Sequence, residues 1–321
     1  METCASFAGR YALGTFSGAD GRRFAGLVAE DRVLDLGRAG IADTTRAVLE
    51  RWDELSPELG ALAAGSGDGW TSLADLRVHA PIEPRQIFQS GANYRTHVID
   101  LMVAHREDGD PRSEEEVRAA TGALMDSRAA HGTPYVFVGL PTAITGPYDD
   151  VVIPEWCTKP DWELELTAVI GREAHRVSVE DALDHVAAYT IANDITAREV
   201  VFRRDMPEIG TDWLQCKNAP TFTPLGPYLV PADAVGDTAD LRVTLTVNGT
   251  TYQDESTKDM IFDVARLVSH ISQSARLLPG DLVLTGSPAG NGLHWGRLLT
   301  DGDVMEGSVT GLGTQRNRVV R

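Results

Sequence analysis

Short apolar runs, each broken after a few residues by Gly or Pro, recur along the C-terminal three quarters of the chain. The clearest of them are DVVIP at 150–154, ELTAVIG at 165–171, PYLV at 227–230, LRVTLTV at 241–247 and LVLTG at 282–286. Runs of this length and composition predict β-strands. Asn248-Gly249, between LRVTLTV and TTYQ, is a dipeptide that favours a two-residue hairpin turn. The pattern therefore predicts a body that is mainly β.

The first 75 residues have a different pattern. Residues 10–36 contain three short strand-like runs, RYALGTF, FAGLV and DRVLDL, and residues 42–64 have a helical pattern. GSGDG at 65–69 is a flexible break. We therefore expect a small N-terminal domain at 1–75, followed by a larger domain at 76–321.

Two helices interrupt the predicted β body. Apolar residues recur at helical spacing over 259–277, and Pro279-Gly280 then ends that helix. A second helix is predicted over 113–130, where Ser and Glu three residues apart form a capping box at its start. This helix lies in a polar stretch from about 103 to 133, which we interpret as a lid over a binding site.

The charge of the chain limits its partners. Among 321 residues, 47 are acidic and 29 are basic, which gives a formal net charge of −18. Nucleic acid is excluded as a partner because phosphate binding needs a basic surface, and the chain has no basic stripe. An anionic substrate would need a local positive centre, which a bound cation would provide.

Membrane insertion, secretion and disulfide formation find no support in the sequence. No basic flank precedes a long apolar run at the start, and no stretch approaches 18 apolar residues, so we expect a cytoplasmic protein without a membrane partner. The three cysteines, Cys4, Cys157 and Cys216, are odd in number and lack CxxC spacing. They argue against a disulfide framework or a zinc knuckle.

Acidic residues alternate in DWELELTAVIG at 161–171. On a strand, alternate side chains share a face, so Asp161, Glu163 and Glu165 would point to one side. This segment alone leaves two interpretations open: a solvated acidic face, or a site for a hard cation, which prefers oxygen ligands. Asp194 follows an apolar run directly, and alone it would serve as a cap or turn residue. As a third carboxylate beside a Glu-x-Glu pair, it favours the metal site.

His97 and Asp100 lie three residues apart in SGANYRTHVID at 90–100. On a helix they would share a face and could form a hydrogen bond. A histidine oriented by a carboxylate is typical of a general base, whereas the alternative is a structural histidine with no chemical role.

Five ordered motifs together resemble the fumarylacetoacetate hydrolase superfamily over about residues 80–321. They are NYRTH, DWELEL, ANDITAR, the segment from Cys216-Lys217 to TFTPLGP, and LTGSPAGNG. The resemblance implies a mixed, β-rich fold, in which a C-terminal β-roll domain follows a small N-terminal α+β domain. It also implies assembly as a homodimer.

The resemblance implies a role for particular residues. Glu163, Glu165 and Asp194 match divalent-metal ligands, for which Mg²⁺ or Mn²⁺ is expected and Ca²⁺ is a further candidate. His97 matches the histidine that activates water, and Asp100 matches its acidic partner, which is usually a glutamate.

Four more residues are implied to act on a small 2-oxo acid substrate. Lys217 matches the lysine that reaches the substrate carboxylate or enolate. Ser287 and Arg106 match substrate-binding positions. Val201 stands where many members have a glutamine, and Gln215 is the candidate to replace it.

The activity implied by the resemblance is metal-dependent hydrolysis of a carbon–carbon bond in a 2,4-dioxo acid of the acylpyruvate type. The products would be pyruvate, or a related 2-oxo acid, and a carboxylic acid. Alternatives on the same metal site are an oxaloacetate decarboxylase, a tautomerase, or an isomerase or hydratase of 2-oxo-dienoic acids. A non-catalytic dimer that binds a 2-oxo acid is a further alternative. TGSPAG does not have the G-x-S-x-G spacing of a serine hydrolase.

Overall fold

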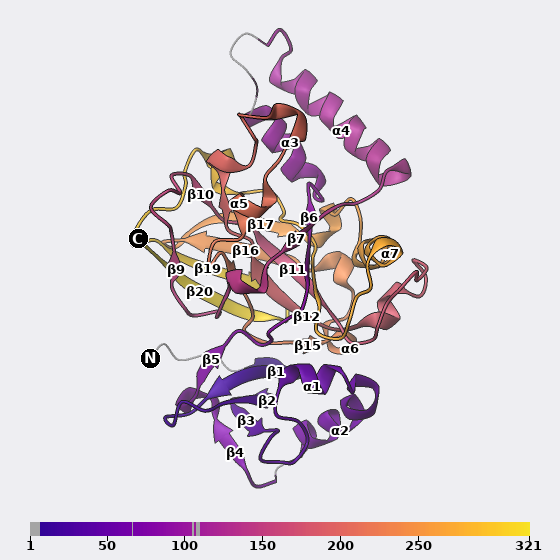
Figure 1. The fold of residues 1–321 in the computed structure, drawn as a ribbon, viewed down its shortest axis with the longest axis vertical. Helices are drawn as coiled ribbons and strands as arrows, with labels where there is room; N and C mark the ends of the chain where they lie inside the picture. The colour runs from indigo at the N-terminus through magenta and orange to yellow at the C-terminus, as the bar shows by residue number, and fades with distance from the viewer. Residues whose placement is uncertain (1–6, 66, 105, 107–109) are drawn as a thin grey trace.

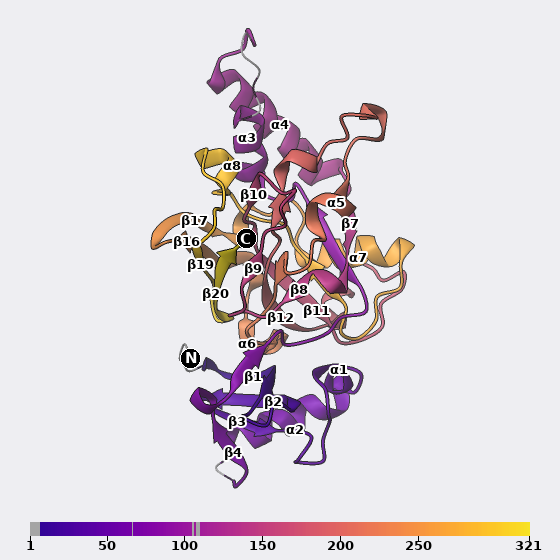
Figure 2. The same ribbon diagram turned by 60° about the vertical axis from the view of Figure 1, so that its left-hand side comes forward.

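The computed structural model describes residues 7–65, 67–104, 106 and 110–321. This part of the chain forms two five-stranded sheets, one six-stranded sheet and two pairs of short strands. The first five-stranded sheet lies at one end of the molecule, and helices α3 (Arg95–Ala104) and α4 (Glu114–His131) lie at the other end (Figures 1 and 2).

The first sheet is antiparallel and has the strand order β4-β3-β2-β1-β5. Its strands are β1 (Phe7–Ser17), β2 (Arg23–Glu30), β3 (Arg32–Asp35), β4 (Trp70–Ser72) and β5 (Arg77–His79). The expected helical segment divides into α1 (Thr45–Leu49) and α2 (Trp52–Ala64). Leu55 and Leu59 of α2 are buried with Leu13 and Leu27 of the sheet. The fifth strand lies just beyond residue 75, where we expected the N-terminal domain to end.

The six-stranded sheet forms the centre of the molecule, with the strand order β15-β12-β11-β18-β6-β7. Its strands are β6 (Ile87–Gly91), β7 (Tyr135–Gly139), β11 (Leu164–Ile170), β12 (Val186–Asn193), β15 (Val230–Pro231) and β18 (Leu282–Leu284). Every residue of β11 and β12 is buried. Strands buried on both faces carry mostly apolar residues, and this is the pattern of the two runs, in which Glu165 is the charged exception.

The second five-stranded sheet contains the predicted hairpin. Its order is β17-β16-β19-β20-β9, and its strands are β9 (Val151–Val152), β16 (Arg242–Val247), β17 (Thr250–Ser256), β19 (Val304–Val309) and β20 (Gly313–Val320). Val247 pairs with Thr250, so the turn has two residues. Asn248 and Gly249 both have positive φ, of 52° and 78°, which confirms the hairpin. The two-strand pairs are β8 (Ile144–Thr145) with β14 (Thr223–Pro224), and β10 (Pro160–Asp161) with β13 (Thr196–Ala197).

The described residues also form four further helices: α5 (Trp213–Lys217), α6 (Ala232–Val235), α7 (Val264–Ser274) and α8 (Gly292–Trp295). The predicted start of the 259–277 helix is wrong, because Asn93 binds the backbone N–H groups of Ile261 and Phe262 and holds them outside the helix. Helix α7 begins only after Asp263, whose side chain accepts from the Arg266 N–H.

The second predicted helix is confirmed as α4. The Ser113 hydroxyl accepts from the Glu116 N–H, and the Glu116 carboxylate accepts from the Ser113 N–H, so the capping box is complete. Within the described residues, no helix has the length and apolar character needed to cross a lipid bilayer. Cys157 and Cys216 are buried free thiols, and Cys4 lies outside the described residues.

Gly249→Ala should destabilise the protein through the backbone alone. A Cβ at this position would meet no atom within 4 Å, but φ is +78°, which an L-residue adopts at a cost of about 1 kcal/mol. Urea denaturation should show this loss in the free energy of unfolding. Gly67→Ala is the matched control, because a Cβ there is equally free of neighbours and φ is not in the left-handed region. Equal stability of the two variants would contradict the turn assignment.

Candidate active site

Three buried carboxylates, Glu163, Glu165 and Asp194, gather beside the central sheet. One oxygen of each lies within 4.8 Å of the others. Glu165 is on β11, Glu163 directly precedes this strand, and Asp194 directly follows its neighbour β12. The expectation that Glu163 and Glu165 share a face and that Asp194 joins them is therefore confirmed.

Backbone contacts fix the approach of the two strands. Leu164 pairs with Asn193 in the ladder, so the residues on either side of this pair are adjacent. The Asp194 N–H donates to the Glu163 carbonyl at 2.8 Å, and the Glu163 N–H donates to Oδ1 of Asn193 at 2.9 Å. The Glu163 N–H thus binds a side chain and not the backbone of β12, and the regular strand β11 begins one residue later, at Leu164.

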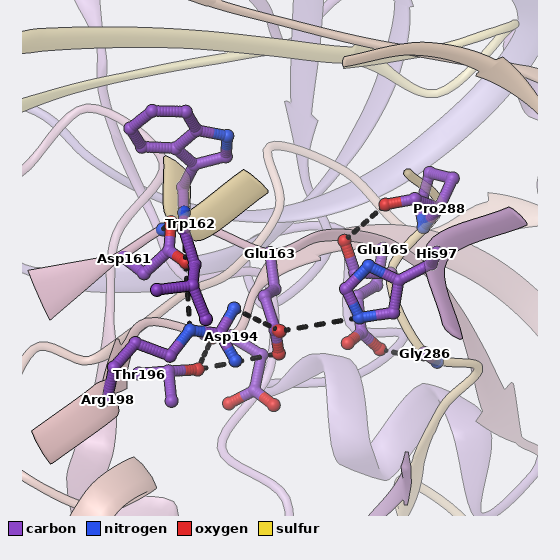
Figure 3. Close-up of polar contacts among 12 residues, drawn as sticks. His97, Asp161, Trp162, Glu163, Glu165, Asp194, Thr196, Arg198, Gly286 and Pro288 are labelled. Atoms are coloured by element: carbon purple, nitrogen blue, oxygen red, sulfur yellow. Dashed lines mark hydrogen bonds and ion pairs between the residues drawn. The ribbon is translucent and has the colours of Figure 1, made fainter. Parts of the chain in front are cut away.

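The predicted continuous acidic strand over 161–171 is wrong at this point. Asp161 lies on β10, and its carboxylate accepts from the N–H of Trp162, which interrupts the ladder before β11 begins. Asp161 therefore does not join the three clustered carboxylates. It accepts from Nε of Arg198 at 2.8 Å instead, as Figure 3 shows.

Two cations contact the cluster, the buried Lys217 and the partly buried Arg198. Nζ of Lys217 donates to Oε2 of Glu163 and to Oδ2 of Asp194, each at 2.5 Å. Nη2 of Arg198 donates to Oε1 of Glu163 at 2.6 Å (Figure 3). The remaining oxygen of Asp194, Oδ1, accepts from Nε2 of Gln89 on β6 at 2.7 Å.

These cations compensate the three acids unequally. Burial opposes ionisation of Glu163, but the charges of Arg198 and Lys217 outweigh it, so the pKa of Glu163 lies well below its usual range. Burial and the Asp194 carboxylate raise the pKa of Glu165 well above its usual range. Burial also raises the pKa of Asp194 to about 6, although Lys217 opposes the shift. The charges of Lys217 and Arg198 therefore do not fully compensate the buried carboxylates of Glu165 and Asp194.

The residues fit a hard divalent cation. Four buried carboxylates, counting Asp161, face two cations, Lys217 and Arg198, which leaves a formal charge of −2 while His97 is neutral. A divalent ion would neutralise this charge. The three clustered groups offer only oxygen, the ligand type that Mg²⁺, Mn²⁺ and Ca²⁺ prefer. Glu163, Glu165 and Asp194 would hold the ion.

His97 reaches the cluster from helix α3. Its Nε2 lies 4.0 Å from Oε1 of Glu163, and its side chain is buried (Figure 3). Burial lowers the pKa of His97 to about 4, and the charges of Arg198 and Lys217 contribute, although the Glu163 carboxylate opposes the shift. The imidazole is therefore neutral near pH 7 and can accept a proton.

The predicted hydrogen bond between His97 and Asp100 is wrong. Among the described contacts, the Asp100 carboxylate accepts from Nη1 of Arg118 on α4 at 2.9 Å, and it lies 3.9 Å from Nδ1 of His294 on α8. Asp100 acts on the imidazole of His97 only through its charge. The two residues share helix α3, but their side chains have different neighbours.

The other predicted site residues lie at different distances from the cluster. Ser287 is buried, accepts from Nε2 of Gln253 at 2.9 Å, and follows Gly286, whose N–H donates to Oε2 of Glu165. Gln215 is exposed on α5, two residues before Lys217. Arg106 is exposed near Asp110. No described contact joins Gln215 or Arg106 to the carboxylates.

Two residues of the site received no role from the sequence. Arg198 is the only basic residue of YTIANDITAREV. A single basic residue in the segment that carries Asp194 could have been predicted to pair with one of the clustered acids. Gln89 gave no signal, because an amide in an apolar strand does not show which neighbour it faces. Its partner Asp194 is 105 positions further along the chain.

Comparison with known proteins identifies the relatives of the chain. The model of the fumarylacetoacetate (FAA) hydrolase C-terminal family matches residues 86–320. A 2,4-didehydro-3-deoxy-L-rhamnonate hydrolase of Sphingomonas sp. strain SKA58 is 43% identical over 189 residues, which cover 58% of this chain and 65% of the relative. A human mitochondrial oxaloacetate tautomerase is 39% identical, with 58% of this chain and 59% of the relative covered. The match thus spans less than two thirds of either relative.

A solved structure extends the likeness to the whole chain. The fumarylacetoacetate hydrolase of Exiguobacterium antarcticum superposes with a TM-score of 0.76 at 28% identity, and the match covers 97% of this chain and 99% of that one. The N-terminal sheet therefore has a counterpart in that structure.

Glu165→Gln should remove the stabilisation that a divalent ion provides. A ligand at 100 times its Kd adds about 2.7 kcal/mol to the free energy of unfolding, and EDTA should reverse this gain. The variant should fold in EDTA, because Gln can still accept from Gly286, but Mg²⁺ should raise its Tm far less than that of the wild type. Glu58→Gln, an exposed change on α2, is the control. A normal Mg²⁺ shift in Glu165→Gln would contradict the ligand assignment.

Lys217→Met should destabilise the metal-free protein by roughly 3–5 kcal/mol, because it leaves the carboxylates of Glu163 and Asp194 buried without their shared partner. Chemical denaturation in EDTA measures this loss, and Mg²⁺ should restore part of it. Lys258→Met is the control, since its pair with Asp240 is exposed and contributes about 0–1 kcal/mol. Similar losses in both variants would show that Lys217 does not balance the cluster.

Proposed function

This chain belongs to the fumarylacetoacetate hydrolase family, and from that premise we propose that it is a divalent-metal-dependent hydrolase of a 2,4-dioxo acid. The bond cleaved is the one between C3 and C4, and the products are pyruvate or a related 2-oxo acid and a carboxylic acid. One observation carries the proposal: the buried imidazole of His97 lies 4.0 Å from Glu163 of the carboxylate cluster, and Lys217 binds both Glu163 and Asp194.

The name of one relative supports this substrate class. A 2,4-didehydro-3-deoxy sugar acid carries oxo groups at C2 and C4 and no hydroxyl at C3, so it is a 2,4-dioxo acid. The relative is 43% identical to this chain over the matched region. The substituent beyond C4 in our proposal is therefore an alkyl chain, as in acylpyruvates, or a polyol chain.

His97 takes the role of general base. A water molecule that attacks the C4 carbonyl must lose a proton, and the neutral imidazole accepts it. The C3–C4 bond then breaks, C4 becomes the carboxylic acid, and the electron pair of the bond forms the enolate of the 2-oxo acid. Protonation at C3 completes the reaction.

Positive charge at the site favours this cleavage. A cation held by Glu163, Glu165 and Asp194 would supply charge that attracts the substrate carboxylate and 2-oxo oxygen and stabilises the enolate. The ammonium group of Lys217 stays charged, because Asp194 and Glu163 raise its pKa against the effect of burial. It can therefore stabilise the negative charge that develops on the enolate.

The parts of the proposal farther from the cluster rest on the family resemblance. Ser287 would contact the substrate, and it is the best placed of the three candidates because it adjoins the Gly286 that binds Glu165. Gln215 and Arg106 would reach the substrate only after their side chains move. Asp100 would serve as the acidic partner through its charge. We propose a homodimer in the cytoplasm as the working form.

Tautomerisation of oxaloacetate is the second candidate function. A relative with 39% identity carries this name, and the reaction uses the same stabilised enolate. Tautomerisation moves a proton between carbon and oxygen and consumes no water. Decarboxylation, or isomerisation of a 2-oxo-dienoic acid, would likewise need the enolate and no hydrolytic water. The choice between these reactions and hydrolysis therefore depends on what His97 does.

His97→Ala should separate the two functions. The variant should bind Mg²⁺ and oxalate by calorimetry as the wild type does, because His97 is not among the three carboxylate ligands. Its turnover of acylpyruvates and 2,4-dioxo sugar acids should fall by about 10²–10⁴-fold, the usual contribution of a general base. His175→Ala, an exposed change, is the control. Near wild-type cleavage by His97→Ala would exclude the hydrolytic role. A wild type that converts only oxaloacetate would favour the tautomerase or decarboxylase.

A further inference from the structure

The environment of Asp161 suggests a role in the site that its sequence position did not reveal. Its side chain is fully buried, and its carboxylate makes one ion pair, with Arg198, whose other branch binds Glu163 (Figure 3). Arg198 is thus shared between an acid of the cluster and an acid outside it. Because the two acids divide its charge, Asp161 determines how strongly Arg198 neutralises Glu163.

The same carboxylate also holds the start of helix α8. Oδ1 of Asp161 accepts from the Gly292 N–H at 2.6 Å, and Oδ2 accepts from the Leu293 N–H at 3.1 Å. A Cβ at Gly292 would lie 2.7 Å from Oδ1 of Asp161 and 2.1 Å from the Arg297 carbonyl. Only glycine permits this approach, so the contact between Asp161 and α8 is built into the sequence.

Trp162 strengthens this attachment. Its indole Nε1 donates to the Gly290 carbonyl at 3.0 Å, and its ring packs on Tyr252, which in turn contacts Trp295 of α8. The two residues that precede Glu163 therefore fix α8 by hydrogen bonds and by ring packing.

Helix α8 in turn contacts the helix that carries His97. α8 packs against α3, and Nδ1 of His294 lies 3.9 Å from Oδ2 of Asp100. The start of α3, next to His97, is held by Asp259, whose carboxylate accepts from the N–H and the hydroxyl of Thr96. The contacts close a ring, which runs from Glu163 through Arg198, Asp161, α8 and α3 to His97, and from Nε2 of His97 back to Glu163 at 4.0 Å.

We propose that Asp161 is a positioning residue, which sets the charge that Arg198 exerts on Glu163 and, through α8 and His294, the position of the His97 helix. Asp161 touches neither the substrate nor the proposed ion. It acts on both halves of the site, because one oxygen contacts Arg198 and both contact α8. This inference rests on the proposed function only in assigning the cation to Glu163 and the proton transfer to His97.

The first arm of the test is Asp161→Asn, with Mg²⁺ affinity measured by calorimetry. The amide oxygen can still accept from one of the two α8 N–H groups, but the neutral side chain no longer shares the charge of Arg198, which then neutralises Glu163 more fully. The Kd for Mg²⁺ should rise by about tenfold, the lower end of the effect of groups that contact metal ligands. Asp181→Asn, an exposed change, is the control and should bind as the wild type does. An unchanged Kd in Asp161→Asn would overturn the role through Arg198.

The second arm is His294→Gln, with hydrogen exchange measured over Arg95–Ala104. Amide exchange in α3 should become several-fold faster, because the substitution removes the imidazole of α8 that lies beside Asp100, while the Kd for Mg²⁺ stays at the wild-type value. His175→Gln is the control, since His175 is exposed. Exchange in α3 as slow as in the wild type would overturn the role of α8. If Asp161→Asn does not fold, Asp161→Ser takes its place in the first arm, and the second arm still tests the part of the inference that concerns α8.

Neither readout needs turnover, so the inference and the proposed function fail in different ways. A wild type that binds Mg²⁺ but cleaves no 2,4-dioxo acid would contradict the proposed hydrolysis and leave both arms readable. A wild type that binds no Mg²⁺ would contradict the metal assignment and, with it, the role of Asp161 through Arg198. Normal cleavage and binding by the wild type, together with unaltered variants, would overturn the inference alone.

Discussion

Compensation of buried negative charge is the constraint that organises this molecule. Asp161, Glu163, Glu165 and Asp194 are all buried, and an uncompensated buried carboxylate costs several kcal/mol. The fold brings Lys217 from α5 and Arg198 from the segment after β13 to the same place, although they come from separate elements. Even so, Glu165 and Asp194 keep raised pKa values. The remaining negative charge is what a bound divalent cation would neutralise in the proposed function.

The packing of the central sheet offsets the free-energy cost of this buried charge. Strands β11 and β12 are buried along their whole length, and their other side chains pack in the apolar cores. The acids stand where these strands begin or end, so the burial of the leucines and isoleucines offsets the cost of the charges. Strands hold three carboxylates within 4.8 Å of one another more precisely than a flexible loop would.

The sequence predicted the parts of the site that depend on local order and missed those that depend on long-range contacts. Strand alternation placed Glu163 and Glu165 together, and the capping box located α4 to within one residue. The family motifs supplied His97 and Lys217. Helical spacing also paired His97 with Asp100, but this was wrong because spacing does not include Arg118 and His294, which come from other helices. Gln89 could not be predicted either, because its partner Asp194 lies 105 positions further along the chain.

The position of Asp100 also bears on which reaction the proposed site would favour. The carboxylate cluster suits any reaction that passes through an enolate, so it cannot by itself select hydrolysis, tautomerisation or decarboxylation. The choice between these reactions must come from other groups next to the cluster, namely His97 and the helices that hold it. Two ion pairs, Arg118 with Asp100 and Arg95 with Asp126, join α3 to α4. Because these pairs are partly exposed, each contributes only weakly to the stability with which α3 is held against α4. The reaction would then be determined by how firmly α3 is held over the acids, and this depends on α8 as much as on α4.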